Sequence, residues 1–100
     1  MLPKVLLTAF EPYGPWSSNA SWLALVEVTR QLPNNGFLTT RRYPVDFAEL
    51  PQRLHADLQA NYDYVIHLGQ SPGAARIQLE AVALNIMTQA GQPTDPTREL

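Results

Sequence analysis

The sequence contains no cysteine. Disulfide bonds, thiolate metal ligands and a thiol nucleophile are therefore excluded for the residues of this chain. Histidine is almost as scarce, because His55 and His67 are the only two. Any imidazole chemistry within these 100 residues must come from one of those two side chains.

Clusters of basic residues and long apolar runs are missing as well. The seven Lys and Arg residues are scattered apart from Arg41 and Arg42, and the net charge is −2, so we expect no nucleic-acid partner. No apolar run approaches the roughly 20 residues that cross a bilayer, so we expect no membrane partner. The run "VLLTAF" ends at Glu11 and is too short for a signal peptide, which makes a cytoplasmic location the expectation.

The composition that remains is that of a folded protein. With 45% hydrophobic and 16% charged residues, the chain is typical of a globular domain and unlike a disordered tail. One hundred residues suit one domain, so we treat residues 1–100 as a single α/β unit.

Strand and helix patterns alternate along the chain. Strand-like runs cover residues 4–10, 37–45 and 63–69, and Ile77 with Leu79 begins a fourth. Strands that alternate with helices predict an α/β fold, here a three-layer α/β/α arrangement around a mainly parallel sheet. We expect the first, third and fourth strands to form the interior.

Two helices are predicted between the strands. The first starts after Ser18 or Asn19 as N-cap, and "PNNG" (33–36) ends it. The second has Pro51 in its first turn, where a missing N–H does no harm. The apolar residues that define the two helices are Trp22, Leu25, Val26 and Leu32 in the first, and Leu50, Leu54 and Leu58 in the second.

Two loops follow strands and are candidate ligand sites, since ligands of open α/β sheets lie beyond the carboxyl ends of the strands. "FEPYG" (10–14) supplies Phe10 and Tyr13, with Trp16 close behind. These aromatic rings either wall a small apolar pocket or pack beneath their own loop. "GQSPGA" (69–74) supplies Gln70, whose donor and acceptor complement an amide or a lactam.

The second loop also contains the G-x-S-x-G pattern of serine hydrolases, centred on Ser71. Pro72 lacks the N–H that an oxyanion hole needs from the residue after the nucleophile. Both histidines lie upstream, whereas that fold needs one downstream. We therefore reject Ser71 as a nucleophile.

Several other polar residues have structural interpretations. His67 lies within a strand and is interpreted as a hydrogen-bonded core residue in preference to a ligand or base. Glu49, Arg53 and Asp57 fall on the polar side of the second helix and are expected to form a solvated face.

Glu80 interrupts the apolar segment "RIQLEAVALN" (76–85). Burying a carboxylate costs several kcal/mol unless it is paired and hydrogen-bonded, so Glu80 needs a partner. Either it belongs to a site, or it forms an internal salt bridge with Arg76 or Arg98.

Two segments resemble one known family. "LLTAFEPYGPWSSNAS" (6–21) resembles the N-terminal signature of pyroglutamyl-peptidase I, usually close to T-G-F-E-P-F-G-G followed by N-P. "VIHLGQSPGAARIQLEAVALN" (65–85) is similar to its second signature, which leads into I-x-x-E-x-x-A-x-N. The resemblance implies an α/β/α fold and a cytoplasmic cysteine peptidase. Such an enzyme removes N-terminal pyroglutamate from peptides by means of Cys, His and Glu.

The resemblance also implies roles for individual residues. Glu80 matches the glutamate that orients the catalytic histidine, and Phe10 and Tyr13 match the aromatic pair that sandwiches the pyroglutamyl ring. Gln70 matches the position that pairs with lactam or backbone amide groups. A pyroglutamyl peptide is the implied substrate, and neither a cofactor nor a metal is implied.

This sequence departs from the family in length. Family chains are twice as long, and their Cys and His lie in the second half, so the chain resembles a truncated N-terminal half and is expected to be inactive alone. Three possibilities stay open: a fragment of a peptidase, a half-enzyme completed by a second chain, and a non-catalytic module that self-associates or binds a ligand. Uncovered apolar strands favour a homo-oligomer.

Overall fold

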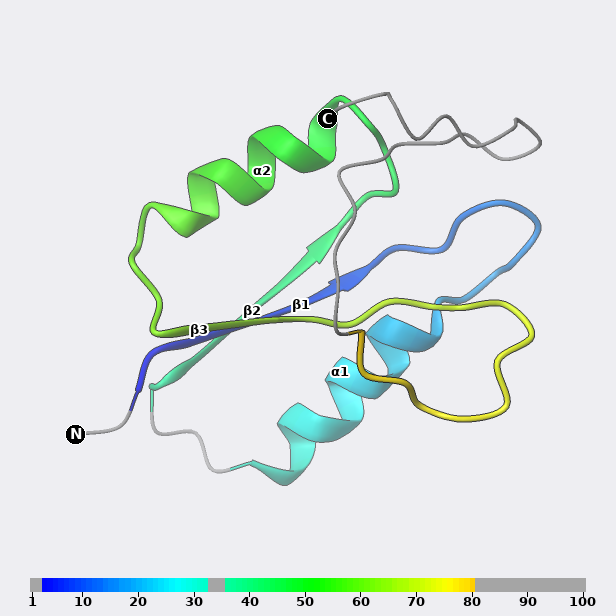
Figure 1. Ribbon diagram of the computed structural model, residues 1–100, viewed down its shortest axis with the longest axis horizontal. Coiled ribbons are helices and arrows are strands. Elements are labelled where there is room, and N and C mark those ends of the chain that lie inside the picture. The colour runs from blue at the N-terminus through cyan, green and yellow to red at the C-terminus, as the bar shows by residue number, and fades with distance from the viewer. Residues whose placement is uncertain (1–2, 33–35, 81–100) are drawn as a thin grey trace. The chain divides into compact units, whose positions relative to one another are not determined.

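A computed structural model describes residues 3–32 and 36–80. The chain divides into two compact units, Met1–Gln70 and Ser71–Leu100. The described helices and strands all belong to the first unit (Figure 1). In chain order they are β1 (Val5–Phe10), α1 (Ala20–Gln31), β2 (Leu38–Tyr43), α2 (Glu49–Leu58) and β3 (Tyr64–His67).

The three strands form one parallel sheet in the order β2-β1-β3. Val5 of β1 is in register with Leu38 of β2 and with Tyr64 of β3. The chain crosses from β1 to β2 through α1, and then back past β1 to β3 through α2. Right-handed crossovers in opposite directions place their helices on opposite faces of a sheet. Figure 1 shows α1 and α2 on opposite sides of the strands, which confirms the predicted α/β/α layering.

The core is centred on β1, because the middle strand of a parallel sheet is covered on both faces. Residues 6–9 are all buried, with Leu6, Thr8 and Ala9 fully enclosed. Leu7 and Ala9 form the core cluster with Leu25 of α1. Three partly buried residues pack against this cluster, namely Trp22, Leu38 and Leu68.

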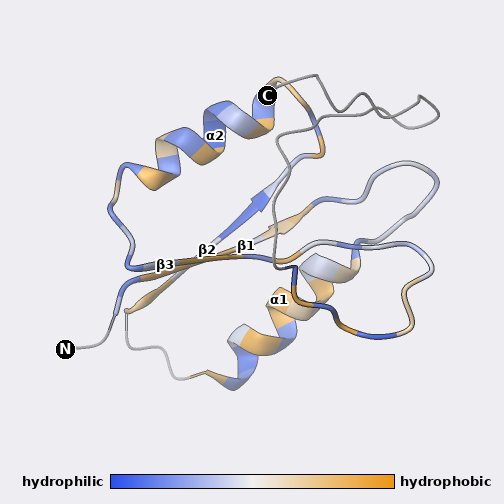
Figure 2. Ribbon diagram, in the orientation of Figure 1, coloured by the Kyte–Doolittle hydropathy of each residue, from blue (hydrophilic) through white to orange (hydrophobic). Residues whose placement is uncertain are grey.

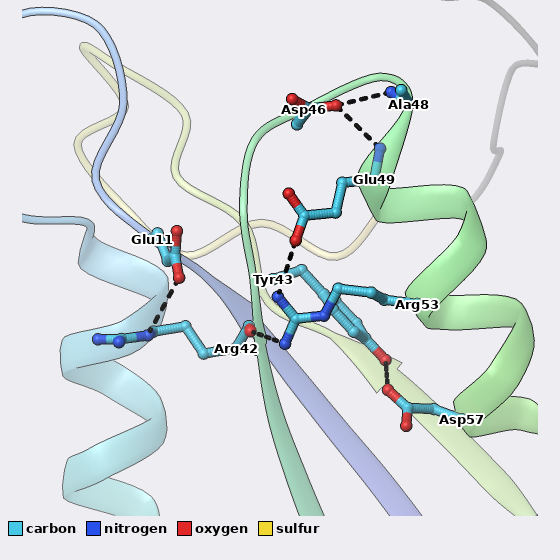
Figure 3. Close-up of polar contacts among 8 residues, drawn as sticks. All are labelled: Glu11, Arg42, Tyr43, Asp46, Ala48, Glu49, Arg53 and Asp57. Atoms are coloured by element: carbon cyan, nitrogen blue, oxygen red, sulfur yellow. Dashed lines mark hydrogen bonds and ion pairs between the residues drawn. The ribbon is translucent and has the colours of Figure 1, made fainter.

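Side-chain oxygens accept backbone N–H groups at the start of both helices. Asn19 is the N-cap of α1, and its Oδ1 accepts the N–H of Ser21 at 2.9 Å. Asp46 precedes α2, and its Oδ1 accepts the N–H groups of Ala48 and Glu49, both at 2.8 Å (Figure 3). These two hydrogen bonds lower the pKa of the Asp46 carboxyl below its ordinary value. Neither helix in the described part of the chain is long and apolar enough to span a membrane.

Two strand predictions are wrong. Among the described strands, the third strand, β3, lies at the sheet edge and not in the interior, and all four of its residues are exposed, including Tyr64 (62%) and Ile66 (49%). Figure 2 shows that much of this exposed strand is hydrophobic. The fourth strand does not begin at Ile77 and Leu79, whose side chains are 96% and 97% exposed in a segment without strand structure. A period of two shows which residues suit a strand, but a strand forms only where a partner pairs with it.

Candidate active site

The first candidate loop presents aromatic side chains beyond the end of β1. Phe10 is the last residue of β1 and is partly buried, as is Tyr13. The centroids of the Tyr13 and Trp16 rings are 5.5 Å apart, and the backbone N–H of Trp16 donates to the Tyr13 carbonyl at 3.3 Å. Gly14 makes this turn possible because its φ is 59°, in the left-handed region that side chains disfavour. Trp16 is 43% exposed, so part of the aromatic group faces solvent.

Buried polar groups hold the two ends of this loop together. Ser21 Oγ accepts the backbone N–H of Phe10 at 2.9 Å and donates to Asn19 Oδ1 at 2.6 Å. Asn19 Nδ2 donates to the Glu11 carbonyl at 3.2 Å. Asn19 and Ser21 are 1% and 2% exposed. The loop therefore leaves β1 and returns to α1 through one enclosed set of hydrogen bonds.

The second candidate loop contacts the same helix end. Gln70 Oε1 accepts the N–H of Ala20, the first residue of α1, at 2.8 Å. This side chain was predicted to offer a donor and an acceptor to a ligand, and the structure shows that the acceptor is already engaged. The Gln70 Nε2 group has no hydrogen bond to another described residue. Both Nε2 hydrogens can therefore be donated to a ligand, whereas Oε1 keeps only one of its two lone pairs for one.

A cation–π contact lies at the start of the first candidate loop, which we call the aromatic loop. The Arg42 guanidinium lies 4.8 Å from the centre of the Trp22 ring, and its Nε lies 3.9 Å from the Glu11 carboxylate (Figure 3). The Glu11 N–H donates to the Tyr43 carbonyl at 2.9 Å, which continues the β1–β2 pairing by one residue. These contacts tie the start of the loop to β2 and to α1.

The polar side of α2 is not simply a solvated face, so that prediction is wrong for Asp57. The Tyr43 hydroxyl donates to Asp57 Oδ2 at 2.6 Å, and Arg41 Nε lies 3.2 Å from Asp57 Oδ1. Arg53 lies over the Tyr43 ring, with Nη1 3.7 Å from Glu49 Oε1 (Figure 3). Tyr43 is 1% exposed. Burial, followed by the hydrogen bond to Asp57, raises the pKa of the Tyr43 hydroxyl.

Sequence reasoning missed this contact between β2 and α2. The available signal was Tyr43 itself, since a buried tyrosine hydroxyl usually finds a partner. The sequence pattern could not show that the partner is Asp57, because the crossover from β2 to β3 determines which turn of α2 faces β2.

His67 has a hydrogen-bond partner, as predicted, but it is not a core residue. Its Nδ1 lies 2.7 Å from Oγ1 of Thr8, which is fully buried on β1. His67 itself is exposed, because β3 lies at the edge of the sheet that the described strands form. Partial burial of the ring lowers the pKa of His67 below its ordinary value.

Ser71 and Glu80 belong to the second unit. The Ala74 N–H donates to the Ser71 carbonyl at 3.1 Å, and Gly73 has a φ of 82°. No helix follows Ser71 within residues 71–80, so the strand, turn and helix of a nucleophile elbow are not formed there.

Glu80 is exposed in the second unit. Within residues 71–80 it makes no ion pair with Arg76, and Arg98 lies outside the described residues. Its role beside Phe10 and Gln70 stays a prediction. Across residues 3–32 and 36–80, no three His, Asp or Glu side chains are grouped in a way that could hold a metal ion.

The described geometry defines an α/β protein with an aromatic loop and an amide-bearing loop after neighbouring parallel strands. Comparisons with known proteins narrow this class. A family model described as pyroglutamyl peptidase matches residues 3–95. The chain belongs to the pyroglutamyl peptidase family.

Individual relatives agree with this assignment. A pyrrolidone-carboxylate peptidase of Clavibacter michiganensis is 38% identical over 86 residues, which are 85% of this chain and 40% of that protein. One from Thermococcus onnurineus is 40% identical over 90 residues, 84% of this chain and 42% of that protein. The crystal structure of pyroglutamyl peptidase I from Bacillus amyloliquefaciens matches all of this chain and 48% of its own length, with 28% identity and a TM-score of 0.75. The chain thus spans less than half the length of these relatives.

Proposed function

We propose that this chain forms the pyroglutamate-binding half of a cytoplasmic cysteine peptidase that removes N-terminal pyroglutamate from peptides. One observation carries the proposal. Phe10 and Gln70, from loops 60 residues apart in a chain of the pyroglutamyl peptidase family, bind neighbouring residues of α1. A ring that stacks on Phe10 would therefore be close to the Gln70 amide.

Each site residue has a distinct task in this proposal. The Phe10 and Tyr13 rings enclose the flat, mostly apolar lactam ring, since aromatic faces supply contact area at little cost in side-chain entropy. Gln70 Nε2 donates to a carbonyl oxygen of the pyroglutamyl group, because its own carbonyl is held by Ala20. Recognition of the lactam thus combines ring stacking with one directed donor.

Glu80 acts in the chemical step. Its carboxylate holds a histidine in the correct tautomer and stabilises the imidazolium that forms when a thiol is deprotonated. The sequence has no cysteine, and the family resemblance puts the catalytic histidine in the second half of family chains, so we assign both groups to residues outside these 100. The chain alone should bind without cleaving.

Binding of free pyroglutamate tests the proposal directly. We expect NMR shift changes at Phe10, Tyr13 and Gln70 with pyroglutamate, and none with proline, which has the same ring size but no lactam carbonyl. Phe10→Ala should abolish the changes. Tyr62→Ala, an aromatic substitution before β3, should leave them intact. Equal responses to proline and pyroglutamate would contradict lactam recognition.

Catalysis supplies the second arm of this test. The chain should release no chromogenic amine from a pyroglutamyl substrate and should resist thiol alkylation. Turnover that survives repurification and disappears in Ser71→Ala would overturn the cysteine-peptidase proposal in favour of a serine nucleophile.

Self-association is a second candidate function, favoured by the exposed edge strand β3. Tyr64 and Leu68 direct their N–H groups toward β1, onto the carbonyls of Lys4 and Thr8. Because alternate residues of a strand face opposite sides, Val65 and His67 direct theirs outward. Two copies of β3 related by a two-fold axis at Ile66 would pair Val65 of each copy with His67 of the other. We propose that the chain forms such a homodimer.

A further inference from the structure

We propose that Asn19 and Ser21, at the start of α1, are positioning residues that fix both ligand-binding loops to one rigid frame. That the two loops bind a ligand rests on the proposed function. The contacts that join the loops are all observed within the first unit. Neither residue touches the proposed ligand; each acts through the backbone of the aromatic loop.

The aromatic loop is closed by side chains and not by strand pairing. Phe10 donates its N–H to Ser21 Oγ, and Glu11 offers its carbonyl to Asn19 Nδ2. Asn19 Oδ1 accepts from both the N–H and the Oγ of Ser21, at 2.9 and 2.6 Å. The Asn19 and Ser21 side chains thus bind backbone groups at the start of the loop, and Asn19 also caps the N-terminus of α1, where the loop ends.

Burial makes this closure rigid. Because Asn19 and Ser21 are almost completely enclosed, water cannot readily replace a lost partner, and a buried group left unpaired is costly. No described side-chain polar atom that is buried lacks a hydrogen bond, so the set is internally complete. The loop residues between the two ends, by contrast, are partly or fully exposed.

The amide loop is attached to the same turn by a different bond. Gln70 Oε1 accepts from Ala20, the residue between Asn19 and Ser21. This single bond orients the side-chain amide so that Nε2 is the group left to donate. Phe10 and Gln70 are therefore separated by one short, hydrogen-bonded segment, and displacement of that segment would move both.

Amide hydrogen exchange measured by NMR on the whole chain tests the frame without a ligand. In Ser21→Ala we expect the Phe10 amide to exchange about five- to tenfold faster, as expected for the loss of one net hydrogen bond. The Ala20 amide should exchange faster in Gln70→Met, which changes a residue that is only partly buried and should not impair folding. Ser18→Ala, an exposed hydroxyl in the same loop, is the matched control and should leave both amides unchanged.

Titration with pyroglutamate then connects the frame to the site. Ser21→Ala should raise the dissociation constant about tenfold although the residue is enclosed, and Ser18→Ala should not. Absence of binding to the unmodified chain would overturn the proposed function, while the exchange data would still decide the frame. Unchanged exchange at Phe10 in folded Ser21→Ala and at Ala20 in Gln70→Met would overturn the inference. If Ser21→Ala does not fold, the Gln70→Met result decides it.

Discussion

Thr8 and His67 are joined across two neighbouring strands, with 2.7 Å between Thr8 Oγ1 and His67 Nδ1. This pair links the fully buried centre of the sheet to its exposed edge. It gives the otherwise unremarkable edge strand a titratable contact with the core.

The pH dependence of stability follows from this pair. Since the pKa of His67 is lower in the folded chain than its ordinary 6.5, the unfolded chain binds the proton more readily. His67 should therefore support folding fully above about pH 6.5 and lose that contribution as pH falls through its folded pKa. As the pH is lowered, the urea concentration at the unfolding midpoint should fall less steeply for His67→Gln than for the unmodified chain. An unchanged slope would show that His67 does not contribute.

Removal of the Tyr43 hydroxyl should destabilise the link between β2 and α2. Tyr43→Phe loses a buried hydrogen bond to a carboxylate, which is worth about 1–2 kcal/mol. Chemical denaturation measures this difference. Tyr62→Phe removes a hydroxyl with no hydrogen-bond partner among the described residues and keeps the ring that contacts Lys4, so it should be close to neutral.

The homodimer predicts a specific sensitivity to proline. Val65→Pro removes an N–H that faces away from β1, so it should spare the sheet and disrupt association. Sedimentation should show dimers for the unmodified chain and for Val65→Ala, and monomers for Val65→Pro. A monodisperse monomer in all three would contradict pairing through β3.

Glu80→Gln should separate the chemical role of Glu80 from any role in folding. Because Glu80 is exposed, this change should shift the unfolding free energy by no more than about 1 kcal/mol in either direction. In a chain that also carries the thiol and histidine, the same change should lower kcat strongly, since the imidazole would lose its orienting anion. A large loss of stability would favour a structural role.

Local sequence signals predicted the elements of the first unit well. Asn19 was recognised as a possible cap because amide and hydroxyl side chains suit that position, and Leu25 because its spacing places it on the inner helix face. Strand order was beyond such signals. Val65 and Ile66 have the apolar character of an interior strand, yet they lie at an edge with 38% and 49% exposure, because the crossovers decide which strand ends next to which.

In the candidate site, too, residue types could be predicted from the sequence but contacts between distant segments could not. Phe10, Tyr13 and Gln70 could be proposed from residue type and motif, but the engagement of Gln70 Oε1 by Ala20 joins residues that are 50 positions apart in the sequence. Neither the buried role of Ser21 nor the partner of Tyr43 was predicted. Both are contacts between distant segments, for which a single sequence carries no periodic signal.

The central position of β1 has a consequence for how the chain acquires its structure. β1 precedes β3 in the chain, and their pairing joins residues as far apart as Val5 and Tyr64. Long-range parallel pairing must overcome loop-closure entropy before it contributes, so folding should be slow for the chain's size. On the ribosome, β2 emerges before β3, so the edge of β1 that pairs with residues 64–67 stays open to misassociation during that interval.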